Sequence, residues 1–590
     1  MRKHGICSIF LAAVVAVSAF ALSACDTNKA AAPKVPEETP PPQEELTFLK
    51  AEGADVKNEN GEKVYLRGVN LGGLFVTEHW MTGFQYTTPS NDFRSLTETF
   101  IKRFGEEKTK ELWAEYRANW WTEDDLKKCA AMGINVIRLP FTYMNVDFDA
   151  LKVEEEEDEN GEKVVVEYKY AGQNYDFSDI DAFVERAAEY GIYTILDLHG
   201  AYGSHNGQDH SGQIIKNAAD VKFFYDDKLQ QLTADLWTAL SEHYKDNPNV
   251  AGYDILNEPG EKAGLTSERH FMVFDKLYKA IRATGDEHIV IFESCWDGKD
   301  LPQPAEYGWE NCMYSFHHYT SNSDTSDKGF LDHSQSWNEK VEGITKQNFG
   351  VPIYMGEFTN YTSESKWDYV LDYLNRLNWH WTSWTYKVWG TTPWGIIDIR
   401  GAGAQKVDAM TDEYEVILEK FKTLKTTSDA ARHYTFPGTE TTLESVFKRH
   451  AKAPAQETEF EEDKYVRFVS DYGYLGCKGK VVSTTAFNIV DDYSSSSLLR
   501  VTYHSSGDGS AYVMFNNQYM CTFTSSGTRY LTLKAKKDTT DNDSRFYPVA
   551  CGDGWAFVSR AACKYLTIGA NGVITATAST IADATIFYIE

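Results

Sequence analysis

The chain has 590 residues, of which 42% are hydrophobic and 25% are charged, a balance typical of a globular protein with substantial buried cores. This composition excludes a mainly disordered, collagen-like or coiled-coil protein. The 58 basic and 87 acidic residues give a net charge of −29, which disfavours nucleic acid and anionic lipid as partners. Aromatic residues reach 14%, and a surplus of Trp and Tyr on an acidic protein favours a neutral, flat ligand such as a sugar.

The first 25 residues have the pattern of an export signal. Arg2 and Lys3 precede an uncharged, mostly apolar run over 6–24. The run closes with Leu22-Ser23-Ala24-Cys25, which resembles a bacterial lipobox, and a plain signal peptide is the alternative. Residues 26–45 are rich in Pro and Glu and predict an extended linker. We expect an extracytoplasmic protein that is secreted or lipid-anchored at the bacterial cell surface, with membrane contact only through Cys25.

Between residues 46 and 425, apolar strand-like runs alternate with helical patterns. The strand-like runs lie at 64–69, 134–140, 192–198, 250–256, 289–292, 313–317, 352–356 and 381–388. Helical segments such as 178–190, 223–245, 269–284 and 366–378 separate most of them. Eight such alternating units predict an α/β fold, a (β/α)8 TIM barrel. An acidic insertion near 146–172 contains an Asn160-Gly161 turn and predicts a solvated hairpin.

The remainder of the chain has a different pattern. Residues 426–459 lack strand or helix periodicity and are predicted to form a linker. From 460 to 590, short strands alternate with Ser, Gly and Asn turns and predict a small all-β domain. Three loosely repeated units carry Tyr474, Tyr519 and Tyr565, spaced 45 and 46 residues apart. They favour a β-trefoil similar to fascin-like and ricin-like modules, with a β-sandwich as the alternative.

Cysteine pairing in this last part stays open. The sequence does not decide how its four cysteines would pair, namely Cys477, Cys521, Cys551 and Cys563.

Two carboxylates follow apolar strands of the predicted barrel, where catalytic groups of such barrels are found. Glu258 lies in Asn257-Glu258-Pro259 after the fourth strand, and Glu357 follows the seventh. A carboxylate at a strand end is costly to desolvate without a partner or a task, so a structural salt bridge is the alternative for either residue alone. Two carboxylates facing one cleft are what cleavage of a glycosidic bond requires.

Motifs around these positions resemble glycoside hydrolase family five, in clan A of retaining glycosidases, over about residues 46–425. The exo-β-1,3-glucanase branch is the most similar. The resemblance is carried by segments 67–73, 135–140, 197–200, 257–259, 317–319, 356–357 and 381–387. It implies a retaining hydrolase of β-glucosidic bonds in β-glucans that needs no cofactor or metal.

Two alternatives to this function stay open. One is an endo-acting β-1,4-glucanase, mixed-linkage glucanase or mannanase of the same family. The other belongs to a different class, a non-catalytic glycan-binding surface lipoprotein.

The resemblance implies a role for each matching residue. Glu258 would be the acid/base and Glu357 the nucleophile, with carboxyl groups about 5–5.5 Å apart. Asn257 would bind the sugar 2-hydroxyl, and Arg138 would hold Glu357 ionised. We expect the pKa of Glu258 to be raised by desolvation and by the charge of Glu357, and the pKa of Glu357 to stay low.

Five further residues are implied as substrate contacts or orienting groups. Tyr319 would orient Glu357, and His317 would contact the substrate or the acid. His199 would bind a sugar hydroxyl above the apolar platform of Trp384. Glu78 would grip the non-reducing sugar, as in the exo branch.

The sequence also departs from the exo-glucanase pattern. Gln208 stands where the branch has Phe, His210 where it has Asn, and Ser321-Asn322-Ser323 where it has a second Phe. The two missing Phe rings normally clamp the +1 sugar, so a preference for β-1,3 linkages is in doubt. His199, His205 and His210 resemble a metal cluster, but no carboxylate or Cys completes a ligand spacing.

Overall fold

The computed structural model describes residues 45–590, except 87–90, 152, 158–162, 169, 171–172, 261–265, 295–296, 321–322, 391–392, 401–402, 426–431, 455–463, 478–486, 491–496, 535–540, 570–571 and 590. The predicted export signal, Cys25 and nearly all of the first predicted linker therefore lie outside the described residues.

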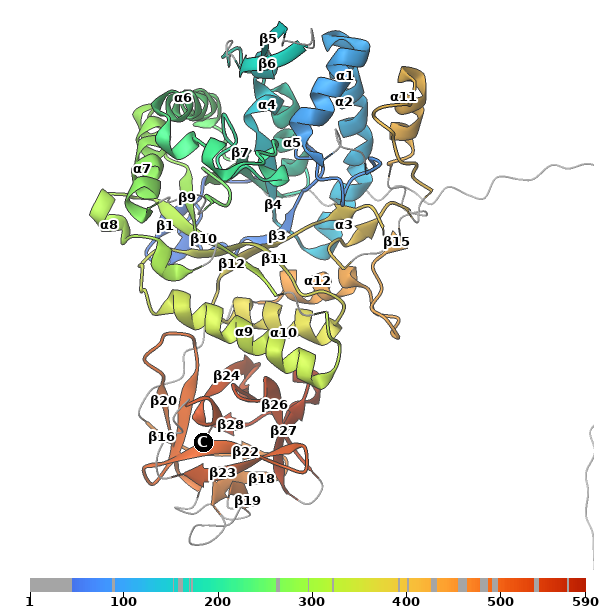
Figure 1. Ribbon diagram of the computed structural model, residues 1–590. Coiled ribbons are helices and arrows are strands. Elements are labelled where there is room, and N and C mark those ends of the chain that lie inside the picture. The colour runs from blue at the N-terminus through green and yellow to red at the C-terminus, as the bar shows by residue number, and fades with distance from the viewer. Residues whose placement is uncertain are drawn as a thin grey trace, which may run out of the picture. The chain divides into compact units, whose positions relative to one another are not determined.

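Eight parallel strands close into a barrel, which confirms the predicted (β/α)8 fold (Figure 1). Their order around the barrel is β10-β11-β12-β3-β4-β7-β8-β9. The strands are β3 (Arg67–Asn70), β4 (Val136–Thr142), β7 (Tyr193–Gly200), β8 (Val250–Asp254), β9 (Ile289–Ser294), β10 (Cys312–Tyr319), β11 (Ile353–Thr359) and β12 (His380–Ser383). Each overlaps one predicted run.

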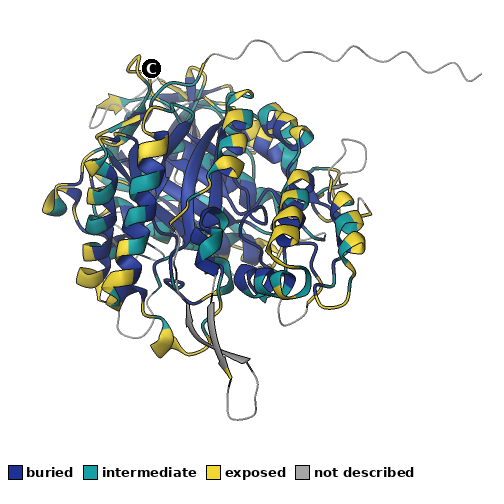
Figure 2. Cartoon of the chain, turned by 90° about the horizontal axis from the view of Figure 1, so that it is seen from above, coloured by how far each residue is buried: buried dark blue, intermediate teal, exposed yellow. Residues whose placement is uncertain are grey.

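Helices cover the outer face of the barrel and side chains of the strands fill its interior, so both faces of each strand are buried, which explains the continuous apolar runs. Every residue of β4 and β7 is buried. Figure 2 shows these buried strands at the centre, ringed by helices whose outer faces are exposed. The helices are α1 (Phe93–Phe104), α2 (Glu106–Trp120), α3 (Glu123–Met132), α4 (Tyr143–Val146), α5 (Ser178–Ala188), α6 (Asp227–Tyr244), α7 (Ser267–Ala283), α8 (Pro304–Tyr307), α9 (Asp327–Thr345), α10 (Glu364–Arg376) and α11 (Tyr414–Lys422).

Local signals account for the bounds of α3. Thr122 and Asp125 form a capping box at its start. Gly133 ends the helix with φ at 84°, a left-handed conformation that costs other residues more. The helix thus begins and ends at signals carried by its own sequence, and the chain then enters β4.

Short strands flank the barrel. The acidic insertion forms the antiparallel hairpin β5 (Val153–Glu157) and β6 (Lys163–Tyr168), which confirms the predicted hairpin. A second hairpin, β1 (Lys50–Glu52) and β2 (Asp55–Lys57), precedes the barrel. A third small sheet contains β13 (Lys387–Val388), β14 (Ile397–Asp398) and β15 (Arg432–His433).

The prediction of a linker over 426–459 is wrong for its middle part, which holds helix α12 (Leu443–Ala451). The Phe447 ring lies 5.8 Å from the rings of Trp367 and Trp381 on the barrel. Arg67 of β3 donates to the backbone carbonyl of His450 at 3.1 Å. The helix has nine residues, so its apolar periodicity is too short to stand out in the sequence.

The chain after residue 463 forms antiparallel sheets, which confirms an all-β domain. One sheet has nine strands and another has four. The strands are β16 (Tyr465–Val466), β17 (Phe468–Ser470), β18 (Gly473–Cys477), β19 (Phe487–Val490), β20 (Leu499–Tyr503), β21 (Ala511–Phe515), β22 (Gln518–Ser525), β23 (Thr528–Lys534), β24 (Phe546–Cys551), β25 (Gly554–Ser559), β26 (Lys564–Ile568), β27 (Ile574–Ala578) and β28 (Tyr588–Ile589). The β-trefoil assignment stays a prediction. Cys551 and Cys563 are free thiols, and the Cys477 side chain is not described.

This β-domain contacts helices α9 and α10 through buried charges. Arg545 lies 3.2 Å from Glu342 of α9 and 2.6 Å from Asp508 of the β-domain. Tyr565 donates to Asp372 of α10 at 2.8 Å. Residues 44–590 form one compact unit. The β-domain therefore packs on the barrel as part of the same compact unit.

Among the described residues, no helix combines the length and the apolar character needed to cross a bilayer.

We expect Phe447→Ala to lower the free energy of unfolding by about 3–5 kcal/mol, because the ring is fully buried between two barrel tryptophans. Lys448→Ala, at a largely exposed neighbour, is the control and should change stability little. Chemical denaturation measures both. If Phe447→Ala costs no more than the control, α12 is peripheral to the barrel after all.

Candidate active site

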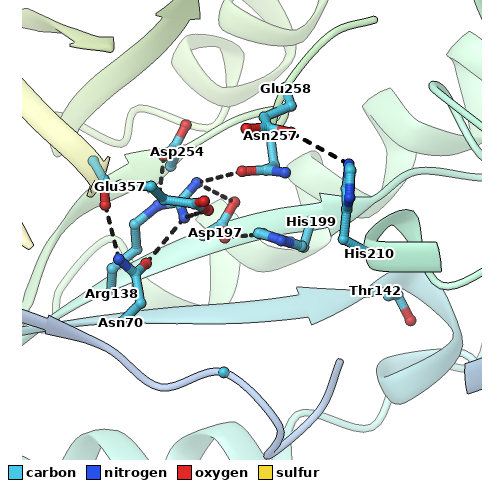
Figure 3. A network of polar contacts seen from close by, with 12 residues as sticks. Asn70, Arg138, Thr142, Asp197, His199, His210, Asp254, Asn257, Glu258 and Glu357 are labelled. Carbon is cyan, nitrogen blue, oxygen red and sulfur yellow. Dashed lines mark hydrogen bonds and ion pairs between the residues drawn. The ribbon is translucent and has the colours of Figure 1, made fainter. Parts of the chain in front are cut away.

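Arg138 of β4 is fully buried and contacts groups from several barrel strands (Figure 3). Its Nη1 donates to Glu357 Oε1 at 2.8 Å and to Asn70 Oδ1 at 3.0 Å. Its Nε donates to Asp254 Oδ2 at 2.9 Å, and its Nη2 to Asn257 Oδ1 at 2.8 Å. The structure thus brings Arg138, Asn257 and Glu357 together, as the sequence predicts.

Two more carboxylates face the same guanidinium. Asp197 Oδ1 lies 3.1 Å and Glu293 Oε2 lies 3.4 Å from Arg138 Nη2. Burial raises the pKa of Asp197 and that of Asp254 to about 7, although the charge of Arg138 opposes this. Burial likewise raises the pKa of Glu293 well above its ordinary value. One cation therefore contacts four buried acids, and burial raises the pKa of three of them.

Glu357 of β11 is the exception among these acids. Burial acts to raise its pKa, but the charges of His317 and Arg138 outweigh burial, so the pKa lies below its ordinary value, as expected. Tyr319 donates its hydroxyl to Glu357 Oε2 at 2.7 Å, so both carboxylate oxygens are hydrogen-bonded. The site holds Glu357 ionised and fixed in orientation.

Glu258 follows β8 and lies between two imidazoles. Its Oε1 is 2.8 Å from His317 Nδ1, and its Oε2 is 3.4 Å from His210 Nε2. Burial acts to raise the pKa of Glu258, but the His317 hydrogen bond and the charges of His210 and His317 lower it below its ordinary value. The expectation of a raised pKa is therefore wrong for the free site, because it weighed burial and Glu357 without the imidazoles.

The two catalytic candidates are close to each other. Oxygens of Glu258 and Glu357 and a nitrogen of His317 all lie within 4.8 Å of one another. This separation suits the direct attack of one carboxylate on a sugar, rather than the wider gap that admits a water molecule. The same three residues are near enough to one another to hold a cation. Arg138 already supplies positive charge to Glu357.

His199 and Trp384 form a flat surface beside this pair. The two rings are stacked, with centroids 5.3 Å apart and planes at 10°. Asp197 Oδ2 contacts His199 Nδ1 at 2.6 Å and fixes the orientation of the imidazole. Burial lowers the pKa of His199 well below its ordinary value, so the ring is neutral and can bind a sugar hydroxyl.

Glu78 lies in the loop after β3 and is buried. It accepts a hydrogen bond from Trp80 Nε1 at 2.7 Å. Burial and the charge of Asp209 raise the pKa of Glu78 well above its ordinary value, and Glu357 and Glu258 add to this effect. The Trp80 ring lies 5.3 Å from Trp394, which lies 5.4 Å from Tyr319, so a chain of ring contacts connects Glu78 with the site.

Several groups of the site were not singled out from the sequence. Glu293 ends the apolar strand β9, so the strand-end rule that found Glu258 and Glu357 would have found it. Trp394 lies in a loop after β13, and its ring centroid is 5.3 Å from Trp80 and 5.4 Å from Tyr319. No strand pattern marks such a loop residue. The sequence gives His210 as a departure from the family pattern and as part of a histidine group, but not as a partner of Glu258.

The buried acids predict a dependence of stability on pH. The pKa of Asp254 is about 7 in the fold against an ordinary 3.8, so the folded chain binds more protons than the unfolded chain between these values. The free energy of unfolding should therefore fall as pH rises from about 4 to 7. Asp254→Asn keeps an oxygen for Arg138 but cannot titrate, so its melting temperature should fall less over this window. Asp246→Asn, at an exposed site, is the control; melting curves of Asp254→Asn that parallel the wild type would contradict the prediction.

The barrel is similar in sequence to known proteins. Residues 100–389 match the family described as cellulase (glycosyl hydrolase family 5). A beta-xylosidase of Phanerodontia chrysosporium is 27% identical over 58% of this chain and 71% of its own length. A sporulation-specific glucan 1,3-beta-glucosidase of Saccharomyces cerevisiae is 30% identical over 44% of this chain and 56% of its own.

A further relative is a probable glucan endo-1,6-beta-glucosidase B of Aspergillus fumigatus, 25% identical over 43% of this chain and 62% of its own length. The chain thus spans less than two thirds of the second and third of these relatives. The matched residues 100–389 include seven of the eight barrel strands, β4 to β12. The barrel of this chain is therefore a glycoside hydrolase family 5 domain.

Proposed function

We propose that the protein is a retaining glycoside hydrolase that cleaves β-glucosidic bonds in β-glucans. Glu258 is the acid/base and Glu357 the nucleophile. The observation that carries the proposal is the pair of carboxylates within 4.8 Å, of which Glu357 is kept ionised by Arg138 and oriented by Tyr319.

The reaction runs in two steps. In the first, Glu357 attacks the anomeric carbon, the bond to the leaving oxygen breaks, and Glu258 gives that oxygen its proton. In the second, Glu258 takes a proton from water, whose oxygen attacks the anomeric carbon and releases Glu357. The ester formed in the first step removes the negative charge of Glu357. That loss lowers the pKa of Glu258 and suits its change from acid to base.

Asn257 is arranged to contact the reacting sugar. Its Oδ1 already accepts from Arg138 Nη2 at 2.8 Å, so the amide NH2 is the group left for a sugar hydroxyl. The 2-hydroxyl is the neighbour of the anomeric carbon, and a hydrogen bond to it strengthens in the transition state. His199 and Trp384 supply the polar and apolar contacts on the other side of that sugar.

We propose that the enzyme acts as an exo-hydrolase with a relaxed preference for linkage type. Glu78 offers a polar end to the cleft, where a terminal glucose can bind. Gln208 is exposed and is not aromatic, so one half of the usual clamp on the leaving sugar is missing, and residues 321–322 are not described. Each lost stacking contact costs roughly 0.5–1.5 kcal/mol, enough to relax linkage choice.

The two alternatives are not equally well supported. Endo action is the second candidate, because one relative is named a probable glucan endo-1,6-beta-glucosidase. A non-catalytic glycan-binding protein has no reason to keep Glu258, Glu357, Arg138, Asn257 and Tyr319 together in one hydrogen-bonded site. From the sequence alone we also propose export and a lipid anchor at Cys25.

We expect hydrolysis of an aryl β-glucoside to give first a product with the β configuration, because displacement occurs twice. Glu357→Gln should abolish turnover. Glu258→Ala should slow hydrolysis of a poor leaving group by about 10²–10⁴-fold and that of dinitrophenolate far less. Proton NMR of the early product and initial rates are the measurements; an inverted first product would refute the two-step mechanism.

A second experiment addresses exo action. A time course on a soluble β-glucan should show steady release of glucose with little loss of viscosity. Glu78→Ala should lower kcat/KM on short oligosaccharides by roughly tenfold, the value of about one hydrogen bond, whereas the exposed neighbour change Gln85→Ala should not. Rapid viscosity loss with mixed oligosaccharides would instead show a cleft open at both ends.

A further inference from the structure

We propose that Glu293 is a positioning residue that holds the acid/base Glu258 and its partner His317 in their working geometry. The inference rests on the proposed function, since it gives Glu293 a part in acid catalysis by Glu258. Glu293 belongs to β9, and its side chain is fully buried.

The first contact is with the backbone of the acid/base. Glu293 Oε1 accepts a hydrogen bond from the Glu258 backbone N–H at 2.8 Å. Glu258 has φ at 40°, in the left-handed region, which is strained for a non-glycine residue. Such a conformation persists only where the surroundings hold it. The carboxyl of Glu293 is a group that holds it directly, at the residue that must give the proton.

The second contact reaches the side chain of the acid/base through an imidazole. His317 Nε2 lies 3.4 Å from Glu293 Oε1, while His317 Nδ1 lies 2.8 Å from Glu258 Oε1. The imidazole thus lies between the two carboxyl groups, with Nε2 on the Glu293 side and Nδ1 on the Glu258 side. Glu293 therefore faces Glu258 from two directions, its amide and its imidazole partner.

The third observation concerns charge. Glu293 Oε2 lies 3.4 Å from Arg138 Nη2, a longer contact than the 2.8 Å between Arg138 and Glu357. Burial and the charge of Asp254 raise the pKa of Glu293 well above its ordinary value. A neutral Glu293 leaves the guanidinium to Glu357 and still offers an oxygen to the Glu258 amide. Among the described residues, the shortest contact of the Glu293 carboxyl is with the Glu258 amide and not with Arg138, which suits a positioning role.

The test compares two substitutions of similar size. Glu293→Met keeps the volume and removes the acceptor, whereas Glu293→Gln keeps an acceptor oxygen and removes the ionisable group. Rates are measured on phenyl β-glucoside, whose leaving group needs the acid, and on 2,4-dinitrophenyl β-glucoside, whose leaving group does not.

We expect Glu293→Met to lose about 10²-fold or more in kcat/KM on the phenyl glucoside, and much less on the dinitrophenyl glucoside. Glu293→Gln should recover most of the phenyl activity. Melting temperatures report whether each variant is folded. If Glu293→Met does not fold, Glu293→Asp, which withdraws the oxygens by one methylene, takes its place with the same expected selectivity.

Equal losses on the two glucosides, or no loss on either, would overturn the positioning role, because a purely structural residue does not distinguish leaving groups. A Gln variant as impaired as Met on phenyl glucoside would also overturn it, since placement of an acceptor would then not be what matters. Failure of the proposed function has a different signature: the wild-type protein would turn over neither glucoside.

Discussion

The guanidinium of Arg138 is the interaction on which the site depends. It is fully buried, and an unpaired charge at such a depth would be strongly destabilising. Its partners come from different barrel strands and from the segment after β8: Asn70 of β3, Asp197 of β7, Asp254 of β8, Asn257, Glu293 of β9 and Glu357 of β11. The closed barrel brings these strand ends around one point, so the site depends on the closure of the barrel.

The distribution of protons within this cluster decides what each acid can do. Four acids lie around one cation, and their contacts determine which of them is stabilised as an anion. Glu357 has the short contact with Arg138 and the hydroxyl of Tyr319, so its charge is stabilised. Burial keeps Asp197, Asp254 and Glu293 closer to their neutral forms. The negative charge is thus concentrated on the group that attacks the sugar in the proposed reaction.

Glu258 lies outside this cluster and has different partners. Its oxygens face His317 and His210 rather than the guanidinium. Two imidazoles therefore hold the carboxyl group of the acid in place. Gly356 and Ser315 lie beside His317, where a Cβ on Gly356 would come within 3.1 Å of its Nε2. Close packing of this kind confines the imidazole to the position from which it contacts both Glu258 and Glu293.

Much of this arrangement could be predicted from the sequence, for identifiable reasons. Apolar runs of strand length marked all eight barrel strands, and Glu258 and Glu357 stood out because a carboxylate rarely ends such a run without purpose. Helix α12 could not be predicted, because its contacts with Trp367 and Trp381 join residues far apart in the chain. The lowered pKa of Glu258 depends on His210 and His317, which approach it only in three dimensions. The contact of the β-domain with α9 depends likewise on Arg545, whose partner Glu342 lies about two hundred residues earlier.

The central claim about the mechanism is that Glu357 is the nucleophile. Incubation with 2,4-dinitrophenyl 2-deoxy-2-fluoro-β-glucoside, which forms the sugar ester quickly and hydrolyses it slowly, followed by peptide mapping, tests this most directly. The account predicts one sugar per chain, attached to Glu357, with one equivalent of dinitrophenolate released. A label on Glu258 or another residue, or continued turnover of a β-glucan without any label, would contradict it.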